Sequence, residues 1–125
     1  MTTNIPRTMM DKVWEAHTIE DLTDSTFLIH VDRHVLHELS GGNSFKGLAA
    51  SGRTVSCPDL TFATIDHLVD TFPGRGGVQY EHAIPNTDQF IEELRKGCEI
   101  NQIPLYDLGD PRQGIVHVVA PELGI

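Results

Sequence analysis

The stretch TFATIDHLVD, Thr61–Asp70, decides the fold of this chain. Its first five residues, Thr61–Ile65, are apolar or β-branched and do not alternate cleanly with polar residues, which predicts a strand covered on both faces. Asp66 and His67 follow directly, where such a strand would reach the rim of its sheet. A carboxylate there can orient and charge a neighbouring imidazole for proton transfer. A strand-end cap or a turn is the other interpretation that this pattern leaves open.

One helix and two strands are predicted after this stretch. Thr87–Ile100 has the pattern of an amphipathic helix, with Asn86 as its cap and Gln89 three residues further on. Its apolar stripe consists of Phe90, Ile91, Leu94 and Cys98. Leu105–Leu108 and Gly114–Ala120 predict strands on either side of a turn. This alternation of strands and helices is typical of a layered α/β domain.

Four further elements are predicted before the stretch. Thr8–His17 has a capped, amphipathic pattern and predicts a short helix, and Phe27–Val31 predicts a strand. His34–Leu39 predicts a second helix that the glycines Gly41-Gly42 stop, and Ser44–Ser51 predicts a third short helix. The chain would therefore run helix, strand, helix, helix before it reaches the buried strand.

Length and composition limit the class of protein. A chain of 125 residues is sufficient for one core and predicts a single domain, in which residues 70–86, rich in glycine and proline, form a mobile surface loop. Nine basic and eighteen acidic residues give a net charge of −9, which repels nucleic acid and anionic membrane surfaces, so neither partner is expected. The apolar run Gly114–Ala120 is too short to cross a bilayer, and no secretory signal follows Met1. We therefore expect a cytoplasmic protein.

The histidines are candidates for chemistry. His30, His34 and His37 are spaced by four and three residues, which suggests zinc, because ligands one helical turn apart can converge on one ion. The predicted strand ends between His30 and His34, so helical spacing does not apply across the break, and we predict no metal site. The alternative is an exposed polar helix face. His117 lies within the apolar run Ile115–Val119, where it could be a hydrogen-bonded core histidine or a functional one.

Several separated motifs resemble one known family. They are Ile29-His-Val-Asp-Arg-His34, His37-Glu38, Thr61-Phe-Ala-Thr-Ile-Asp-His67, Leu105-Tyr-Asp-Leu108 and Gln113-Gly-Ile-Val-His117. Together, and in this order, they resemble the start of the large subunit of the 3-isopropylmalate dehydratases, a branch of the aconitase family. The resemblance extends over nearly the whole chain. It implies that residues 1–125 form the N-terminal part of a three-layer α/β/α domain with a mainly parallel sheet.

The resemblance also implies an activity. Members of this family are hydro-lyases that move water across a hydroxy acid, here 2-isopropylmalate and 3-isopropylmalate in leucine biosynthesis. They use a [4Fe–4S] cluster with one iron open to the substrate. Asp66 and His67 match the family's acid pair, in which the imidazolium donates a proton to the departing hydroxyl. His117 matches a second active-site histidine, and His37 falls where members place a polar side chain that contacts the substrate, which is glutamine in aconitases.

The chain departs from the family pattern at its end. It stops before the family's Gly-Asp-Ser-His segment and its three cluster cysteines, and Cys57 and Cys98 match none of them, so we expect no cluster ligation by this chain. The resemblance thus implies a truncated fragment, inactive alone, whose partners are the rest of the large subunit and a small subunit. Two alternatives stay open. One is a related hydratase of another branched hydroxy acid, such as a methylmalate, and the other is a non-catalytic binding or assembly module.

Overall fold

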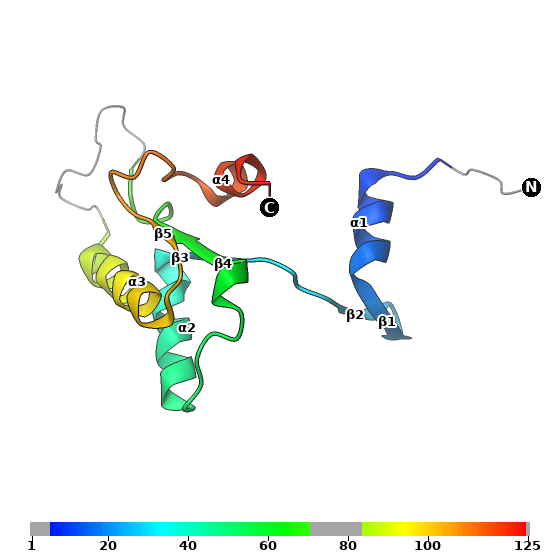
Figure 1. Ribbon diagram of the computed structural model, residues 1–125, viewed down its shortest axis with the longest axis horizontal. Coiled ribbons are helices and arrows are strands. Elements are labelled where there is room, and N and C mark those ends of the chain that lie inside the picture. The colour runs from blue at the N-terminus through cyan, green and yellow to red at the C-terminus, as the bar shows by residue number, and fades with distance from the viewer. Residues whose placement is uncertain (1–5, 71–83, 125) are drawn as a thin grey trace, which may run out of the picture. The chain divides into compact units, whose positions relative to one another are not determined.

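The computed structural model describes residues 6–70 and 84–124 (Figure 1). It consists of two compact units, Met1–Asp32 and Arg33–Ile125, which we describe separately. Most of the loop that we predicted at residues 70–86 lies outside the described residues.

The first unit is a helix followed by a β-hairpin. Helix α1, Met9–His17, begins with a capping box in which Thr8 and Asp11 exchange side-chain-to-backbone hydrogen bonds of 3.1 and 2.8 Å, and the helix predicted here is confirmed. Strands β1, Thr18–Thr23, and β2, Thr26–Ile29, pair antiparallel. The strand predicted at residues 27–31 is thus present but ends at residue 29, while its partner β1 was not predicted.

The second unit contains a parallel sheet of three strands in the order β3-β4-β5. The strands are β3, His34–His37, β4, Thr61–Thr64, and β5, Leu105–Tyr106. The predicted strand at the start of the opening stretch is confirmed as β4, and all four of its residues are buried. The helix predicted at residues 34–39 was wrong for its first four residues, because pairing with β4 holds them extended. An α/β fold with a parallel sheet is confirmed.

Helix α2, Glu38–Ala50, is continuous through the two glycines that we expected to stop it. Both Gly41 and Gly42 are buried. A Cβ atom on Gly41 would lie 2.5 Å from Leu94 Cδ1, and one on Gly42 would lie 2.8 Å from Glu93 Cβ. The glycines therefore allow close packing against the next long helix, and the prediction of two short helices was wrong.

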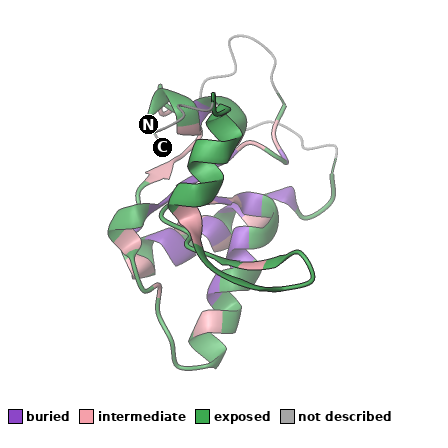
Figure 2. Cartoon of the chain, turned by 90° about the vertical axis from the view of Figure 1, so that its right-hand side faces the viewer, coloured by how far each residue is buried: buried purple, intermediate pink, exposed green. Residues whose placement is uncertain are grey.

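Helix α3, Thr87–Asn101, confirms the predicted helix, and Ile91, Leu94 and Cys98 of its stripe are buried while Phe90 is half-buried. A short 3₁₀ turn, η1, Pro58–Leu60, precedes β4. Asn86 precedes α3 in a left-handed conformation, and its side chain makes no capping hydrogen bond, contrary to our expectation. Helices α2 and α3 pack on one face of the sheet, and Figure 2 colours the buried positions purple. The core cluster consists of Leu36, Phe45, Ala63, Ile65, Ile91, Leu94, Cys98 and Ile103.

Helix α4, Val116–Glu122, replaces the strand that we predicted at residues 114–120. The apolar pattern of residues 114–120 was interpreted as a strand. In the structure, the backbone at the start of this segment forms hydrogen bonds with side chains far away in the sequence and not with a neighbouring strand. Thr64 Oγ1 donates to the carbonyl of Gly114 at 3.1 Å, and Asp66 Oδ2 accepts from the N–H of Val116 at 2.9 Å. A carboxylate beside the first N–H groups of a helix stabilises that helix end. The start of α4 is thus held by hydrogen bonds to residues about fifty positions earlier in the sequence.

Candidate functional site

Three of the four predicted site residues meet at the carboxyl ends of two parallel strands. His37 is the last residue of β3, and Asp66 and His67 follow β4, which ends at Thr64. The register pairs His37 with Thr64, so the two strand ends lie side by side. The rings of His37 and His67 stack with centroids 3.7 Å apart and planes inclined by 12°. Carboxyl ends of parallel strands are where α/β sheets carry their ligand sites.

The Asp66–His67 pair is a fixed carboxylate and a more accessible imidazole. Asp66 Oδ1 lies 2.6 Å from His67 Nδ1, and the exposed fractions of the two side chains are 3% and 37%. The second oxygen of Asp66 accepts from Val116, so both carboxylate oxygens are engaged. A carboxylate on Nδ1 selects the ring tautomer and leaves Nε2 to exchange a proton with a ligand. Asp66 also accepts from the first N–H of α4, and its role in proton transfer stays a prediction.

His37 is a half-buried imidazole beside this pair. Its Nε2 lies 3.4 Å from Ser40 Oγ, while its Nδ1 is buried and has no hydrogen-bond partner among the described residues. Burial lowers the pKa of His37, and the neighbouring His67 lowers it further. The stack therefore favours a neutral His37, because two charged rings in contact would repel each other.

Glu38 is a site residue that we did not identify from the sequence. It begins α2 directly after His37 and is completely buried. Its Oε2 accepts from the N–H of Asp66 at 3.1 Å, and its Oε1 accepts from the N–H of Leu68. The motif His37-Glu38 contains this residue, but its burial follows from the pairing of β3 with β4, which no local pattern reveals.

Two more polar side chains attach the segment before α4 to this end of the sheet. Thr64 Oγ1 bonds Gly114, and Gln113 Nε2 donates to the carbonyl of Ile65. Both residues lie within motifs quoted above, but neither was identified from the sequence as a site residue. The sequence offers only a weak signal for them, a threonine and a glutamine beside otherwise apolar runs. Without the register of the sheet, this signal does not show that the two side chains meet the same end of the sheet.

His117 lies on α4 and is exposed, so the interpretation as a buried core histidine was wrong. Its backbone follows Val116, whose N–H binds Asp66. The structure gives the His117 imidazole no hydrogen bond to another residue of the described ranges. Its backbone is thus placed beside the Asp66–His67 pair, without a side-chain contact to it.

The four residues His37, Glu38, Asp66 and His67 have potential metal-ligand atoms within 4.8 Å of one another. Their hydrogen bonds argue against a shared ion. Both oxygens of Glu38 and both oxygens of Asp66 already accept hydrogen bonds. The stacked rings hold their lone pairs in nearly parallel planes, which cannot both point at one ion. The arrangement therefore suits proton transfer better than metal binding.

The zinc set considered from the sequence is not assembled on one face. His34 and His37 begin and end β3, three residues apart. Side chains alternate between the faces of a strand, so residues at this spacing point to opposite faces. The absence of a metal site stays a prediction.

The cysteines do not suit an iron–sulfur cluster. The chain has only two. Cys57 is exposed, whereas Cys98 is buried in α3. Burial, with a smaller contribution from Asp107, raises the pKa of the Cys98 thiol to about 12, so it is protonated at neutral pH. Cluster ligands are thiolates, and a [4Fe–4S] cluster of this type needs three of them, so the residues present do not fit the group.

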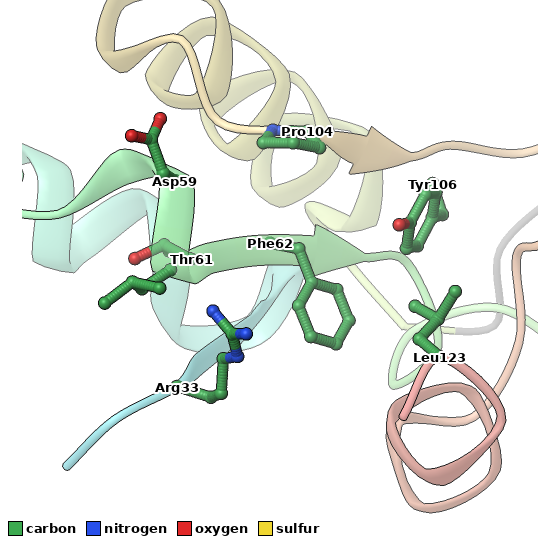
Figure 3. A pocket seen from close by; sticks show the side chains of 8 residues that line it. Arg33, Asp59, Thr61, Phe62, Pro104, Tyr106 and Leu123 are labelled. Atoms are coloured by element: carbon green, nitrogen blue, oxygen red, sulfur yellow. The ribbon is translucent and has the colours of Figure 1, made fainter. Parts of the chain in front are cut away.

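A pocket of about 290 Å³ lies against β4 and β5 (Figure 3). Its lining residues are Arg33, Asp59, Leu60, Thr61, Phe62, Pro104, Tyr106 and Leu123. Phe62 and Tyr106 are on the sheet face opposite the core cluster, where Leu123 follows α4. The lining includes none of the four predicted site residues, so this pocket is separate from the stacked histidines.

Comparison with known proteins agrees with the motifs. The model of the aconitase family (aconitate hydratase) matches residues 11–125. The chain is 41% identical over 119 residues to the 3-isopropylmalate dehydratase large subunit 1 of Bradyrhizobium diazoefficiens. This match covers 95% of the chain and 24% of the relative, so the chain spans about a quarter of that protein's length. No solved structure gave a significant match. Within residues 6–70 and 84–124, no helix is long and apolar enough to cross a membrane.

Proposed function

The chain belongs to the aconitase family, and from this premise we propose that it is part of a hydro-lyase that interconverts 2-isopropylmalate and 3-isopropylmalate by dehydration and rehydration. The observation that carries the proposal is the Asp66–His67 pair at the carboxyl ends of β3 and β4, with a buried carboxylate and an accessible imidazole. The name of the Bradyrhizobium relative supplies the substrate class. This reaction would serve leucine biosynthesis in the cytoplasm.

His67 would act as the general acid. Its Nδ1 is held by Asp66, so the proton on Nε2 of the imidazolium is the one that it can donate. As the carbon–oxygen bond of the substrate breaks, the departing hydroxyl takes this proton and leaves as water. Asp66 stabilises the imidazolium by its charge and fixes the direction of the ring. A base from outside these 125 residues would remove the proton on the neighbouring carbon.

His37 and His117 would have supporting roles. His37 lies against the ring of His67 and, as a neutral imidazole, can offer a hydrogen bond to the substrate without repelling the charged ring. His117 is exposed on the helix whose first N–H is held by Asp66. It would be available to a substrate or to a carboxylate from outside this chain.

The iron–sulfur cluster of the family would be ligated outside this chain, since Cys57 and Cys98 do not fit it. We assign no catalytic step of these residues to it. The partners that complete the site would be the rest of a large subunit and a small subunit, as the relative's name suggests.

A chimaera tests the proposal. This chain would replace the matching quarter of the Bradyrhizobium large subunit, and the product would be assembled with the small subunit. We expect isomerisation of isopropylmalate, and His67→Asn should lower turnover on the order of 10²-fold at equal cluster content. The matched control is His34→Asn, an exposed histidine at the start of β3, which should leave turnover unchanged.

Two results would contradict the proposal. One is unchanged turnover in the His67→Asn chimaera. The other is a folded, cluster-loaded chimaera that does not act on isopropylmalate. Activity on a methylmalate instead of isopropylmalate would indicate that the chain is part of a related hydratase. No activity on any branched hydroxy acid would favour a non-catalytic assembly module.

A further inference from the structure

We propose that Glu38 is a positioning residue that fixes the Asp66–His67 pair, although it touches neither substrate nor the reacting imidazole. Its kinetic consequence rests on the proposed function, whereas its effect on the His67 ring can be measured in this chain alone. The role of Glu38 and the proposed function can therefore be contradicted by separate results.

The geometry places the two acceptors of Glu38 around His67. One oxygen accepts from the N–H of Asp66, the residue before His67, and the other accepts from the N–H of Leu68, the residue after it. The backbone on both sides of the imidazole is thus held by one side chain. Since Glu38 follows His37 directly in the chain, the same residue also fixes the distance between the two strand ends that carry the stacked rings.

Because Glu38 is buried, its carboxylate depends on these hydrogen bonds. Glu38 has an exposed fraction of 0%, and a carboxylate removed from water is tolerated only when hydrogen bonds or charges compensate it. Here the compensation comes from two backbone N–H groups and from the amino end of α2, where Glu38 is the first residue. A buried acid with this set of partners is therefore tied to the 66–68 segment and cannot be exchanged freely.

The chemistry of the side chain explains why a glutamate is needed. Two N–H donors require two acceptors, and a carboxylate has two oxygens that only accept. A glutamine of the same size has one carbonyl oxygen and one NH₂ group, so one backbone N–H would face another donor. Glu38→Gln should therefore release one side of the segment while it preserves the volume of the core.

The first experiment follows the His67 ring of this chain by ¹⁵N NMR. In the unsubstituted chain, the neutral ring should carry its proton on Nδ1, as the contact with Asp66 requires. Glu38→Gln should shift the ring nitrogens toward the tautomer mixture of a free imidazole. The matched control is Glu93→Gln, which also removes a carboxylate bound to Lys46 and Gln89 on the α2–α3 surface and should leave the ring signals unchanged.

A structural role alone predicts a different result. Glu38→Gln would then lower the melting temperature with no change in the His67 tautomer, and this result would overturn the proposal. If the variant does not fold, the unsubstituted chain decides. The amides of Asp66 and Leu68 should be protected from exchange and show scalar coupling through the hydrogen bond to the Glu38 carboxylate carbon, and fast exchange without coupling would overturn the proposal.

The second experiment uses the chimaera. Glu38→Gln should lower kcat on the order of 10- to 100-fold with KM changed less than about twofold, because misplacement of a catalytic group costs rate more than binding. Glu38→Asp keeps both acceptors and should recover part of kcat, and Glu93→Gln should have no effect. Unchanged kcat in an active chimaera overturns the proposal. An inactive unsubstituted chimaera with the expected NMR result contradicts only the proposed function.

Discussion

Within residues 6–70 and 84–124, each unit of the molecule has a contact between a histidine and an aspartate, and the two contacts differ in their surroundings. In the first unit, His17 Nε2 lies 3.1 Å from Asp32 Oδ2, and the side chains are 32% and 61% exposed. In the second unit, His67 Nδ1 lies 2.6 Å from Asp66 Oδ1, and Asp66 is 3% exposed. A surface pair is screened by water and contributes little. A buried carboxylate with a second hydrogen bond fixes its imidazole.

The surroundings differ because only one unit has a core. No residue of 6–32 is buried, and the contacts of α1 with the hairpin include the edge-to-face pair of Trp14 and Phe27, whose ring centroids are 5.1 Å apart. The second unit buries the apolar side of its parallel sheet under α2 and α3. A pair of residues is therefore informative about function only together with the packing that holds it.

The largest expected effect tests the difference in packing. Leu94→Ala, in the core of the second unit and 0% exposed, should lower the free energy of unfolding of that unit by about 2–5 kcal/mol. Val13→Ala, in α1 with 49% exposure, should change stability by less than about 0.5 kcal/mol. Urea unfolding followed by far-UV circular dichroism measures both. Trp14, the single tryptophan, reports on the first unit, and a shift of its fluorescence transition in Leu94→Ala would show that the units unfold together.

The next effect compares the two aspartates directly. Asp66→Asn places a buried amide NH₂ against one of two donors, His67 Nδ1 or the N–H of Val116, and should cost about 1–3 kcal/mol. Asp32→Asn removes an exposed contact and should leave the urea midpoint unchanged within error. In the chimaera, only Asp66→Asn should reduce turnover. If the two substitutions changed the urea midpoint and the turnover equally, the buried and the exposed pair would not differ in the way argued above.

Much of the site was predictable, since its parts are local in sequence. Thr61–Ile65 as a buried strand, followed by Asp66 and His67, required only a short window. The errors have a common physical origin in distant contacts. His34–His37 is extended because it pairs with β4, and residues 116–122 form a helix where Asp66 binds the N–H of Val116. Local patterns carry no information about these partners.

Glycine and glutamate were misjudged or missed for the same reason. Gly41 and Gly42 look like helix stops, but they lie where α2 packs closely against Leu94 and Glu93 of α3. Glu38 was missed because the two backbone N–H groups that it binds, those of Asp66 and Leu68, lie about thirty residues away in the sequence. Residues that organise a site through the backbone of another segment therefore need the tertiary structure to be identified.

The smallest effect is a difference in the pH dependence of the two units. The backbone carbonyl of Val13 and then Asp32 raise the pKa of His17 above its ordinary value of 6.5, whereas burial and then His67 lower the pKa of His37 below it. A raised histidine pKa gives stability that is present below pH 6.5 and is lost as pH rises through the folded value. A lowered one gives stability that is present above pH 6.5 and is lost as pH falls through the folded value.

Between pH 8 and pH 5, the first unit should therefore gain stability on acidification while the second unit loses it. Urea midpoints across this range, read from Trp14 fluorescence for the first unit and circular dichroism for the second, measure the two slopes. His17→Gln should flatten the first slope and His37→Gln the second, because each removes the titrating group. Two outcomes would contradict this prediction: slopes of the same sign, or a second slope that persists in His37→Gln. Either would show that protonation of His37 does not cause the loss of stability of the second unit on acidification.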